Sequence, residues 1–467
     1  MVTLTIALRS LARRKVRMIL IALLVLLGTI LIVFGETFSL SAKKSSRSAI
    51  INYFTGDLVI YSDKSKEKPS PFSFTTPLPP VPDPGRVESW LARNEYVDAF
   101  VSIAQNYGIL SAERDGRTVD VPFFFYAVNP GKYSAMFSNI VMKEGTFYNI
   151  NSGQDSTVSG VVLSTFQLKN YYKNYSIDLR PGDAVRLLSL SDGGSVNAVS
   201  SRVIGTYEPK YYRNVFNYIN FLDITSYSRL YNFTGVEASS MPASFNNALT
   251  SESDEDIFGL AQSGMDKLDT RQLVASDISG FSIIAVRLRE GADARAFSDA
   301  LMKEGLGVKA AFWNEASGFF AYIAAIIQGV IYGATFLIFL AVVFILMNTL
   351  IINVLERTGE IGTLRAMGAE KGFIAAEFLW ESFLLNGTAA LLGMAASIIL
   401  ITVSGGSIVL PDVLQQYLVG GGPLILQLSV RPFAEAFAII IIVSLLATLY
   451  PISVATSVTP LKAMSGN

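Results

Sequence analysis

The chain has 467 residues, a formal net charge of -1, 51% hydrophobic residues and only 16% charged residues. Soluble proteins carry about 25% charged residues, so the low fraction of charged residues here indicates membrane-spanning segments. A near-neutral charge argues against a nucleic-acid partner, which requires a basic face. The absence of cysteine and histidine excludes disulfides, HExxH zinc sites, Cys nucleophiles and Ser-His-Asp triads.

The N-terminal region predicts a cytoplasmic interfacial helix (residues 1–17) followed by a first membrane span (18–42). Leu4, Leu8 and Leu11 form an apolar stripe beside basic residues, a pattern typical of a helix lying on the inner leaflet. Only basic charges precede the span, which places the N-terminus in the cytoplasm by the positive-inside rule. A cleaved signal peptide is the alternative, but the apolar run is longer than the usual core of about 7–15 residues.

Residues 43–318 are soluble in character and are expected to fold as an α/β domain outside the membrane. Short β-rich runs lie at 56–61 and 160–164. A hairpin is predicted around Asp192-Gly193-Gly194, between strands at about 185–189 and 199–205. A strand–helix–strand unit is predicted over 281–312, with Phe297 and Leu301 of its helix facing inward.

Two stretches of this region are predicted to be loops. Prolines crowd residues 69–84, where so many missing N–H donors exclude a packed strand or helix. This segment is either a docking arm for an external partner or a flexible insertion, and the sequence favours the insertion. Residues 251–256, S-E-S-D-E-D, form an acidic loop.

Three further runs, at 319–355, 373–403 and 433–452, are long enough to span a membrane. With the first span they give four crossings, which place loop 404–432 outside and tail 453–467 in the cytoplasm. Residues 319–355 would form a helix of about 55 Å, against a hydrocarbon core of about 30 Å. Its outer turns are therefore expected to protrude as a stalk that acts as a lever. Pro451 is expected to end the last helix at the cytoplasmic boundary.

Acidic residues within or beside the spans are candidates for function. Glu381 lies inside the third span, where we expect a structural role near the cytoplasmic end. Glu36 and Glu435 lie at the outer ends of their spans, where interfacial water is within reach. Ion-coupled transport would need more charged residues inside the membrane than these, so it is disfavoured.

The segment 356–372 is short and charged, and it lies between the second and third spans. Its first fourteen residues read E-R-T-G-E-I-G-T-L-R-A-M-G-A. Arg357, Ile361 and Leu364 share one helical face, and Gly368 is placed to end the helix. Taken alone, this pattern also fits a loop that only lies at the lipid headgroups.

This string closely resembles the coupling-helix motif E-R-x-x-E-I-G-x-L-R-A-x-G-A of the FtsX/MacB/LolC-LolE-type permeases, the membrane subunits of type VII, mechanotransmission-family ABC transporters. The endings Tyr450-Pro451-Ile452-Ser453 and Thr459-Pro460-Leu461 also resemble the closing pattern of that family. The resemblance implies four transmembrane α-helices, with a large α/β extracytoplasmic domain of porter and sabre type between helices 1 and 2. It suggests a β-rich, sabre-like part at about 155–270.

The resemblance also implies that an ATPase subunit contacts segment 356–372. Leu364 and Ile361 are expected to enter a groove on that partner, while Arg357, Glu360 and Arg365 make ion pairs at its rim. The full set of predicted coupling residues is Glu356, Arg357, Glu360, Ile361, Leu364, Arg365, Met367 and Gly368.

No Walker A sequence G-x-x-x-x-G-K-[ST] occurs in the chain. The chain is therefore expected to be non-catalytic, with no metal or cofactor of its own, and ATP-Mg is expected on a separate ABC ATPase dimer. Because such a dimer presents two grooves, a second permease copy or a paralogue is expected beside this chain.

The resemblance leaves several activities open. One is extraction of lipoproteins from the inner membrane for the outer membrane, as in LolC/LolE-type subunits, with acyl chains held by Leu27, Ile30, Phe339 and Val343 between spans one and two of paired subunits. Others are MacB-like efflux of antibiotics or peptides from the periplasm, and signal transduction without transport. We favour lipoprotein release, with a lipoprotein or other amphipathic substrate, a periplasmic carrier and membrane lipid as partners. The expected location is the bacterial inner membrane, with both termini cytoplasmic.

Overall fold

A computed structural model describes residues 15–70, 78–114, 116–147, 160–190, 196–231, 233 and 280–457. The chain divides into two compact units. The helical unit comprises Met1–Ser46, Tyr322–Val419 and Pro423–Asn467, and the sheet unit comprises Arg47–Ala321 and Gly420–Gly422. Most of the predicted interfacial helix, the centre of the proline-rich segment and the acidic loop lie outside the described residues.

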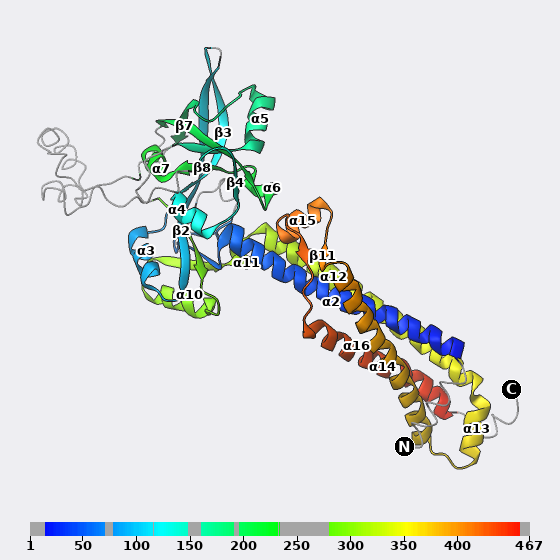
Figure 1. The fold of residues 1–467 in the computed structure, drawn as a ribbon. Helices are drawn as coiled ribbons and strands as arrows, with labels where there is room; N and C mark the ends of the chain where they lie inside the picture. Colours follow the sequence, from blue (N-terminus) through cyan, green and yellow to red (C-terminus); the bar gives the residue numbers. More distant parts are fainter. Residues whose placement is uncertain are drawn as a thin grey trace, which may run out of the picture. The chain divides into compact units, whose positions relative to one another are not determined.

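The helical unit contains the four predicted spans. Among the described residues, four helices are long and apolar enough to cross a membrane. They belong to α2 (Lys15–Ile50), α12 (Phe319–Glu356), α14 (Lys371–Val403) and α16 (Val430–Ser457). The predicted membrane protein with four transmembrane helices and an α/β domain between the first and second is thereby confirmed (Figure 1).

Two of these helices are longer than the sequence suggested. The first span was expected to end at residue 42, but α2 continues to Ile50 and is followed by a π-helical turn, η1 (Ile51–Thr55). The prediction that Pro451 ends the last helix is wrong, because α16 passes through Pro451 to Ser457. Proline removes one backbone hydrogen bond, and neighbouring helices in a membrane bundle tolerate that loss.

Small residues allow the helices of this unit to approach closely. A Cβ on Gly28 of α2 would lie 3.1 Å from Val342 of α12, and one on Gly393 of α14 would lie 2.8 Å from the Leu26 carbonyl oxygen of α2. Glycine at a helix contact brings backbones together, as is common in membrane bundles. The buried apolar cluster at this level contains Met18, Ile21, Val25, Leu346, Ala389, Ala390, Ile440, Val443 and Ala447.

The sheet unit is built on one ten-stranded sheet in the order β10-β1-β9-β2-β3-β8-β5-β7-β4, with β6 paired to β2 and β7. The strands are β1 (Leu58–Ser62), β2 (Val97–Arg114), β3 (Arg117–Val128), β4 (Ile140–Gly145), β5 (Val161–Ser164), β6 (Ala184–Leu190), β7 (Val196–Pro209), β8 (Asn220–Asp223), β9 (Ile283–Leu288) and β10 (Val308–Phe312). The helices are α3 (Pro84–Arg93), α4 (Pro130–Met136), α5 (Thr165–Tyr175), α6 (Arg213–Phe216), α7 (Ile224–Leu230), α10 (Ala294–Lys303) and α11 (Trp313–Ala316).

Several predictions for this unit are confirmed. The runs at 56–61 and 160–164 become β1 and β5, and β6 and β7 form the predicted hairpin, with Leu190 opposite Val196. The strand–helix–strand unit is β9-α10-β10, with Phe297 and Leu301 buried. In space, β1 lies between β9 and β10 and pairs antiparallel with both. The described part of region 155–270 contributes β5 to β8 to the same continuous sheet.

The segment 404–432 is more ordered than a simple loop. Helix α15 (Asp412–Val419) lies between two short strands, β11 (Ser407–Ile408) and β12 (Leu424–Ile425), which pair with each other. The tip of this segment, Gly420–Gly422, belongs to the sheet unit.

Candidate coupling site

The segment between α12 and α14 forms the predicted short helix, α13 (Thr358–Ala366). Arg357 lies at the joint, where its backbone N–H donates to the carbonyls of Asn353 and Val354 at 3.2 and 3.1 Å. Gly368 adopts φ +96°, a left-handed conformation that glycine reaches without strain. As predicted, this glycine terminates the helix, and Ala369 N–H donates back to the Leu364 carbonyl at 3.0 Å.

The Arg357 side chain holds α13 against α14 through a buried group of charges. Its Nη2 donates to Glu377 Oε1 at 2.8 Å, its Nη1 to Glu381 Oε2 at 2.9 Å, and its Nε to Glu360 Oε2 at 3.0 Å. The guanidinium also lies 5.4 Å from the centre of the Phe378 ring. Each of the three guanidinium nitrogens therefore donates to a different carboxylate, which is an arrangement that suits arginine rather than lysine.

Because these side chains are buried, the stability of each charge depends on its partners. Arg357, Glu377 and Glu381 are 6%, 2% and 3% exposed. Burial lowers the pKa of Arg357, but the charge of Glu381 and the hydrogen bonds to Glu377 and Glu360 outweigh it, so the net pKa lies above its ordinary value. The arginine stays charged, and the glutamates depend on it because an unpaired buried charge is costly.

Arg357 and Ile361, predicted to contact a partner, are both buried within the chain itself. Ile361 is 2% exposed and packs with Val354, Ile374, Phe378 and Ala455 of its own chain. Arg357 is an internal ion-pair centre instead of a rim residue. The apolar face of α13 was assigned to a partner, but the chain itself covers it, because α14 and α16 supply the apolar surface that a short helix needs.

The opposite side of α13 is exposed. Glu356, Glu360 and Met367 are exposed, with Met367 at 77%, and Leu364 is half-buried. Glu360 lies on α13 itself, Glu356 is the last residue of α12, and Met367 directly follows α13, so exposed side chains occur along the whole segment. Arg365 Nη1 donates to the Thr456 carbonyl at 2.9 Å and so links α13 to the end of α16.

Of the acidic residues in the spans, Glu381 has the predicted structural role, since it accepts from Arg357. Glu377, one turn earlier on α14, does the same and was not singled out from the sequence. The signal was present, because Glu377 and Glu381 are spaced i, i+4 in an otherwise apolar run, and one cation can meet both. Glu435 pairs with Arg431 at 2.6 Å near the start of α16.

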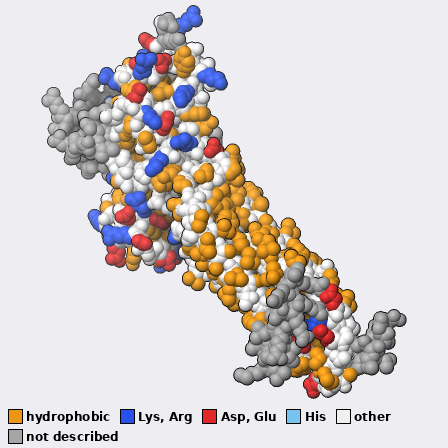
Figure 2. All heavy atoms as spheres, turned by 45° about the vertical axis from the view of Figure 1, so that its right-hand side comes forward, with side chains coloured by type: hydrophobic (Ala, Val, Ile, Leu, Met, Phe, Trp, Pro, Cys, Tyr) orange, Lys and Arg blue, Asp and Glu red, His pale blue; other side chains and the backbone are white. Residues whose placement is uncertain are grey.

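The four predicted acyl-chain residues do not form one described cluster. Phe339 and Val343 pack against the buried residues of the helical unit, while Leu27 is 52% exposed and lies outside that cluster. Ile30 is half-buried. Figure 2 shows hydrophobic side chains gathered on the surface of the helical unit, a distribution suited to lipid contact.

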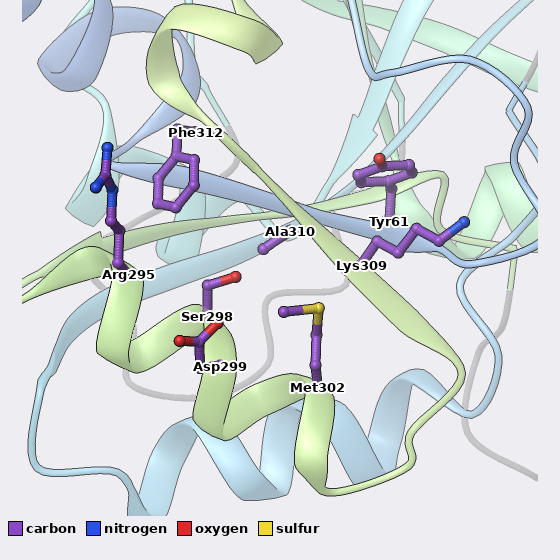
Figure 3. Close-up of a pocket in the computed structure, with 8 residues that line it drawn as sticks. All are labelled: Tyr61, Arg295, Ser298, Asp299, Met302, Lys309, Ala310 and Phe312. Carbon is purple, nitrogen blue, oxygen red and sulfur yellow. The ribbon is translucent and has the colours of Figure 1, made fainter.

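The sheet unit has an open cavity of about 460 Å³ between α10 and the strands β1 and β10 (Figure 3). It is lined by Tyr61, Arg295, Ser298, Asp299, Met302, Lys309, Ala310 and Phe312. Charges of both signs line it, and it contains no residue predicted from the sequence to be functional. Among the described residues, no group of three or more acidic residues is arranged to hold a metal ion.

These features define a multi-pass membrane protein with a short helix between two of its spans, held to α14 by buried ion pairs. Residues 318–460 match the FtsX-like permease C-terminal family. This part of the chain is therefore similar to the C-terminal domain of FtsX-like permeases. No curated protein matches the chain.

Solved structures that resemble the chain are domains of such permeases. The periplasmic region of MacB from Actinobacillus actinomycetemcomitans has 11% identity and a TM-score of 0.30, over 55% of this chain and 88% of its own. The extracellular domain of YknZ, a noncanonic ABC-type transporter from Gram-positive bacteria, has 12% identity and a TM-score of 0.28, over 54% and 98%. A domain of a putative permease from Porphyromonas gingivalis has 12% identity and a TM-score of 0.27, over 54% and 87%. At this level of identity, none of the three structures establishes a function for the chain.

Proposed function

We propose that this chain couples ATP hydrolysis by a separate ABC ATPase dimer to movement outside the membrane. The observation that carries the proposal is the exposed face of the α13 segment, with Glu360 on the helix and Met367 directly after it, while Arg357 at its start is bonded to α14. A partner that pushes on this face cannot displace α13 alone, because Arg357 ties it to two glutamates of α14. The chain itself is non-catalytic in this proposal, and ATP-Mg binds to the partner.

Helix α12 provides the path for that movement. It runs without interruption from Phe319 to Glu356 and ends one residue before Arg357. Its 38 residues correspond to about 57 Å at 1.5 Å per residue, about twice the hydrocarbon thickness. A rigid helix of this length passes a displacement at one end to the other. We place the chain in a bacterial inner membrane with both termini and α13 in the cytoplasm.

The ATPase partnership has a direct test. The full-length permease, purified from its host membrane under mild conditions, is expected to carry an ABC ATPase. Native mass spectrometry should show two permeases, identical or paralogous, per ATPase pair. Glu360→Gln keeps an acceptor for Arg357 Nε and should weaken the complex only modestly, since exposed pairs contribute about 0–1 kcal/mol. Purified permease that never retains an ATPase, or one permease per ATPase pair, contradicts the proposal.

We further propose that the cargo is a lipid-anchored protein passed to a periplasmic carrier. Support comes from the exposed apolar surface that includes Leu27 on α2. An acyl chain gains about 0.8 kcal/mol per buried CH₂, so such a surface binds it readily. Leu27 and Ile30 remain candidate contacts, and Phe339 and Val343 would take part only if the helices separate during the cycle.

Depletion of the protein in its host distinguishes the candidate cargoes. Lipoprotein release predicts that outer-membrane lipoproteins accumulate in the inner membrane, as measured by membrane fractionation and mass spectrometry. Normal lipoprotein localisation together with sensitivity to macrolides or peptide antibiotics supports MacB-like efflux instead. Ligand-stimulated ATPase activity with no released product supports a signal transducer.

A further inference from the structure

One side chain of the sheet unit contacts all three segments through which the chain enters or leaves that unit. The sheet unit comprises Arg47–Ala321 and Gly420–Gly422. The Tyr212 ring lies 5.7 Å from Phe54, in the turn that continues α2, and 5.2 Å from Phe320, at the start of α12. Its backbone N–H donates to the Gly420 carbonyl at 2.6 Å.

The conformation of Tyr212 is one that a bulky residue adopts only when its surroundings require it. Its φ is +49°, in the left-handed region, and its side chain is completely buried. Its hydroxyl has no hydrogen-bond partner among the described residues. A strained backbone and an unsatisfied buried hydroxyl both oppose folding, and such features concentrate at functional positions.

The contact with Gly420 depends on the absence of a side chain there. Gly420 has φ +66°, and a Cβ at this position would lie 2.7 Å from the Tyr212 ring. Phe54 and Phe320 also meet each other, with ring centres 6.0 Å apart, so the three segments share one aromatic cluster. Displacement of any one segment must therefore disturb the packing of the other two against Tyr212.

We propose that Tyr212 is a positioning residue that links three segments to one another: the end of α2, the start of α12 and the 420–422 tip. Because they are linked, movement of these segments displaces the whole sheet. The inference rests on the proposed function and adds the place where movement of the helices reaches the sheet. Without the tyrosine ring, each segment can shift independently, and helix movement is only partly passed on.

The lack of cysteine in the chain makes the test direct, because spin labels can be placed without removing native thiols. Labels go on Lys173→Cys, exposed on α5 of the sheet unit, and Val403→Cys, 81% exposed at the end of α14. Pulsed EPR measures their separation in the full permease–ATPase complex, without nucleotide and with ATP trapped by vanadate.

The unmodified pair should show a nucleotide-dependent shift that Tyr212→Phe preserves, because the ring remains. Tyr212→Ala should lose at least half of the shift while the complex still hydrolyses ATP. Gly420→Ala alters only the loop tip and should have the same effect, so it decides the question if Tyr212→Ala fails to fold. A full shift in Gly420→Ala and in folded Tyr212→Ala overturns the inference, as does a hydrolysing complex with no shift at all. A chain that binds no ATPase overturns the proposed function instead.

Discussion

Replacing Arg357 with alanine should release α13 from α14 and destabilise this part of the helical unit by about 3–5 kcal/mol. The variant leaves Glu377 and Glu381, 2% and 3% exposed, as adjacent buried carboxylates without their shared cation. Hydrogen exchange of the α13 amides in the purified permease measures the loss. Since 1.4 kcal/mol corresponds to a tenfold change in an equilibrium constant, the protection factors should fall at least a hundredfold or until the amides exchange freely.

Two further variants test whether the loss of stability comes from the unpaired buried charges or simply from removing a side chain. Arg365→Ala removes one hydrogen bond from the same helix, to the Thr456 carbonyl, and should cost only about 0.5–1.5 kcal/mol. Combining Arg357→Met with Glu377→Gln and Glu381→Gln removes the three buried charges and should recover much of the stability. If Arg357→Ala costs no more than Arg365→Ala, Arg357 does not hold the two helices together.

The helices were largely predictable, because span length follows from bilayer thickness and needs no tertiary information. The ends of α2 and α16 were not, since whether a helix continues past Ala42 or through Pro451 depends on what packs beside it. The long β2–β3 hairpin was missed although Asp115-Gly116 in the sequence is a strong hairpin signal. The strands on either side of it pair from Arg114 opposite Arg117.

The coupling helix shows what the spacing of apolar residues in a sequence cannot predict. The spacing of Ile361 and Leu364 identifies an apolar face on α13, but it does not say whether the chain itself or a partner covers that face. The answer depends on Ile374, Phe378 and Ala455, which come from two other helices. Likewise, Glu381 was recognisable as an acid in an apolar span, but its pairing with Arg357 required the two helices to be placed side by side.

Introducing aspartate at Leu364 or Met367 should remove most of the affinity for the ATPase. Both side chains are available to a partner, since Leu364 is half-buried and Met367 is 77% exposed. Burial of such an apolar side chain contributes about 1.5–3 kcal/mol, and an unpaired carboxylate in its place must be desolvated as well. The dissociation constant should therefore rise at least a hundredfold, as measured with purified permease and purified ATPase in a binding titration.

Met302→Asp is the matched control, because Met302 is 50% exposed on α10 of the sheet unit. The same substitution there should leave ATPase affinity unchanged. Retention of wild-type affinity by both Leu364→Asp and Met367→Asp would move the docking surface away from α13. Leu364→Asp should also leave the protection of α13 amides nearly intact, because Leu364 is only half-buried and the helix is held by Ile361 and Arg357. Loss of binding with a preserved helix identifies a contact surface, whereas Arg357→Ala affects binding only by disordering the helix.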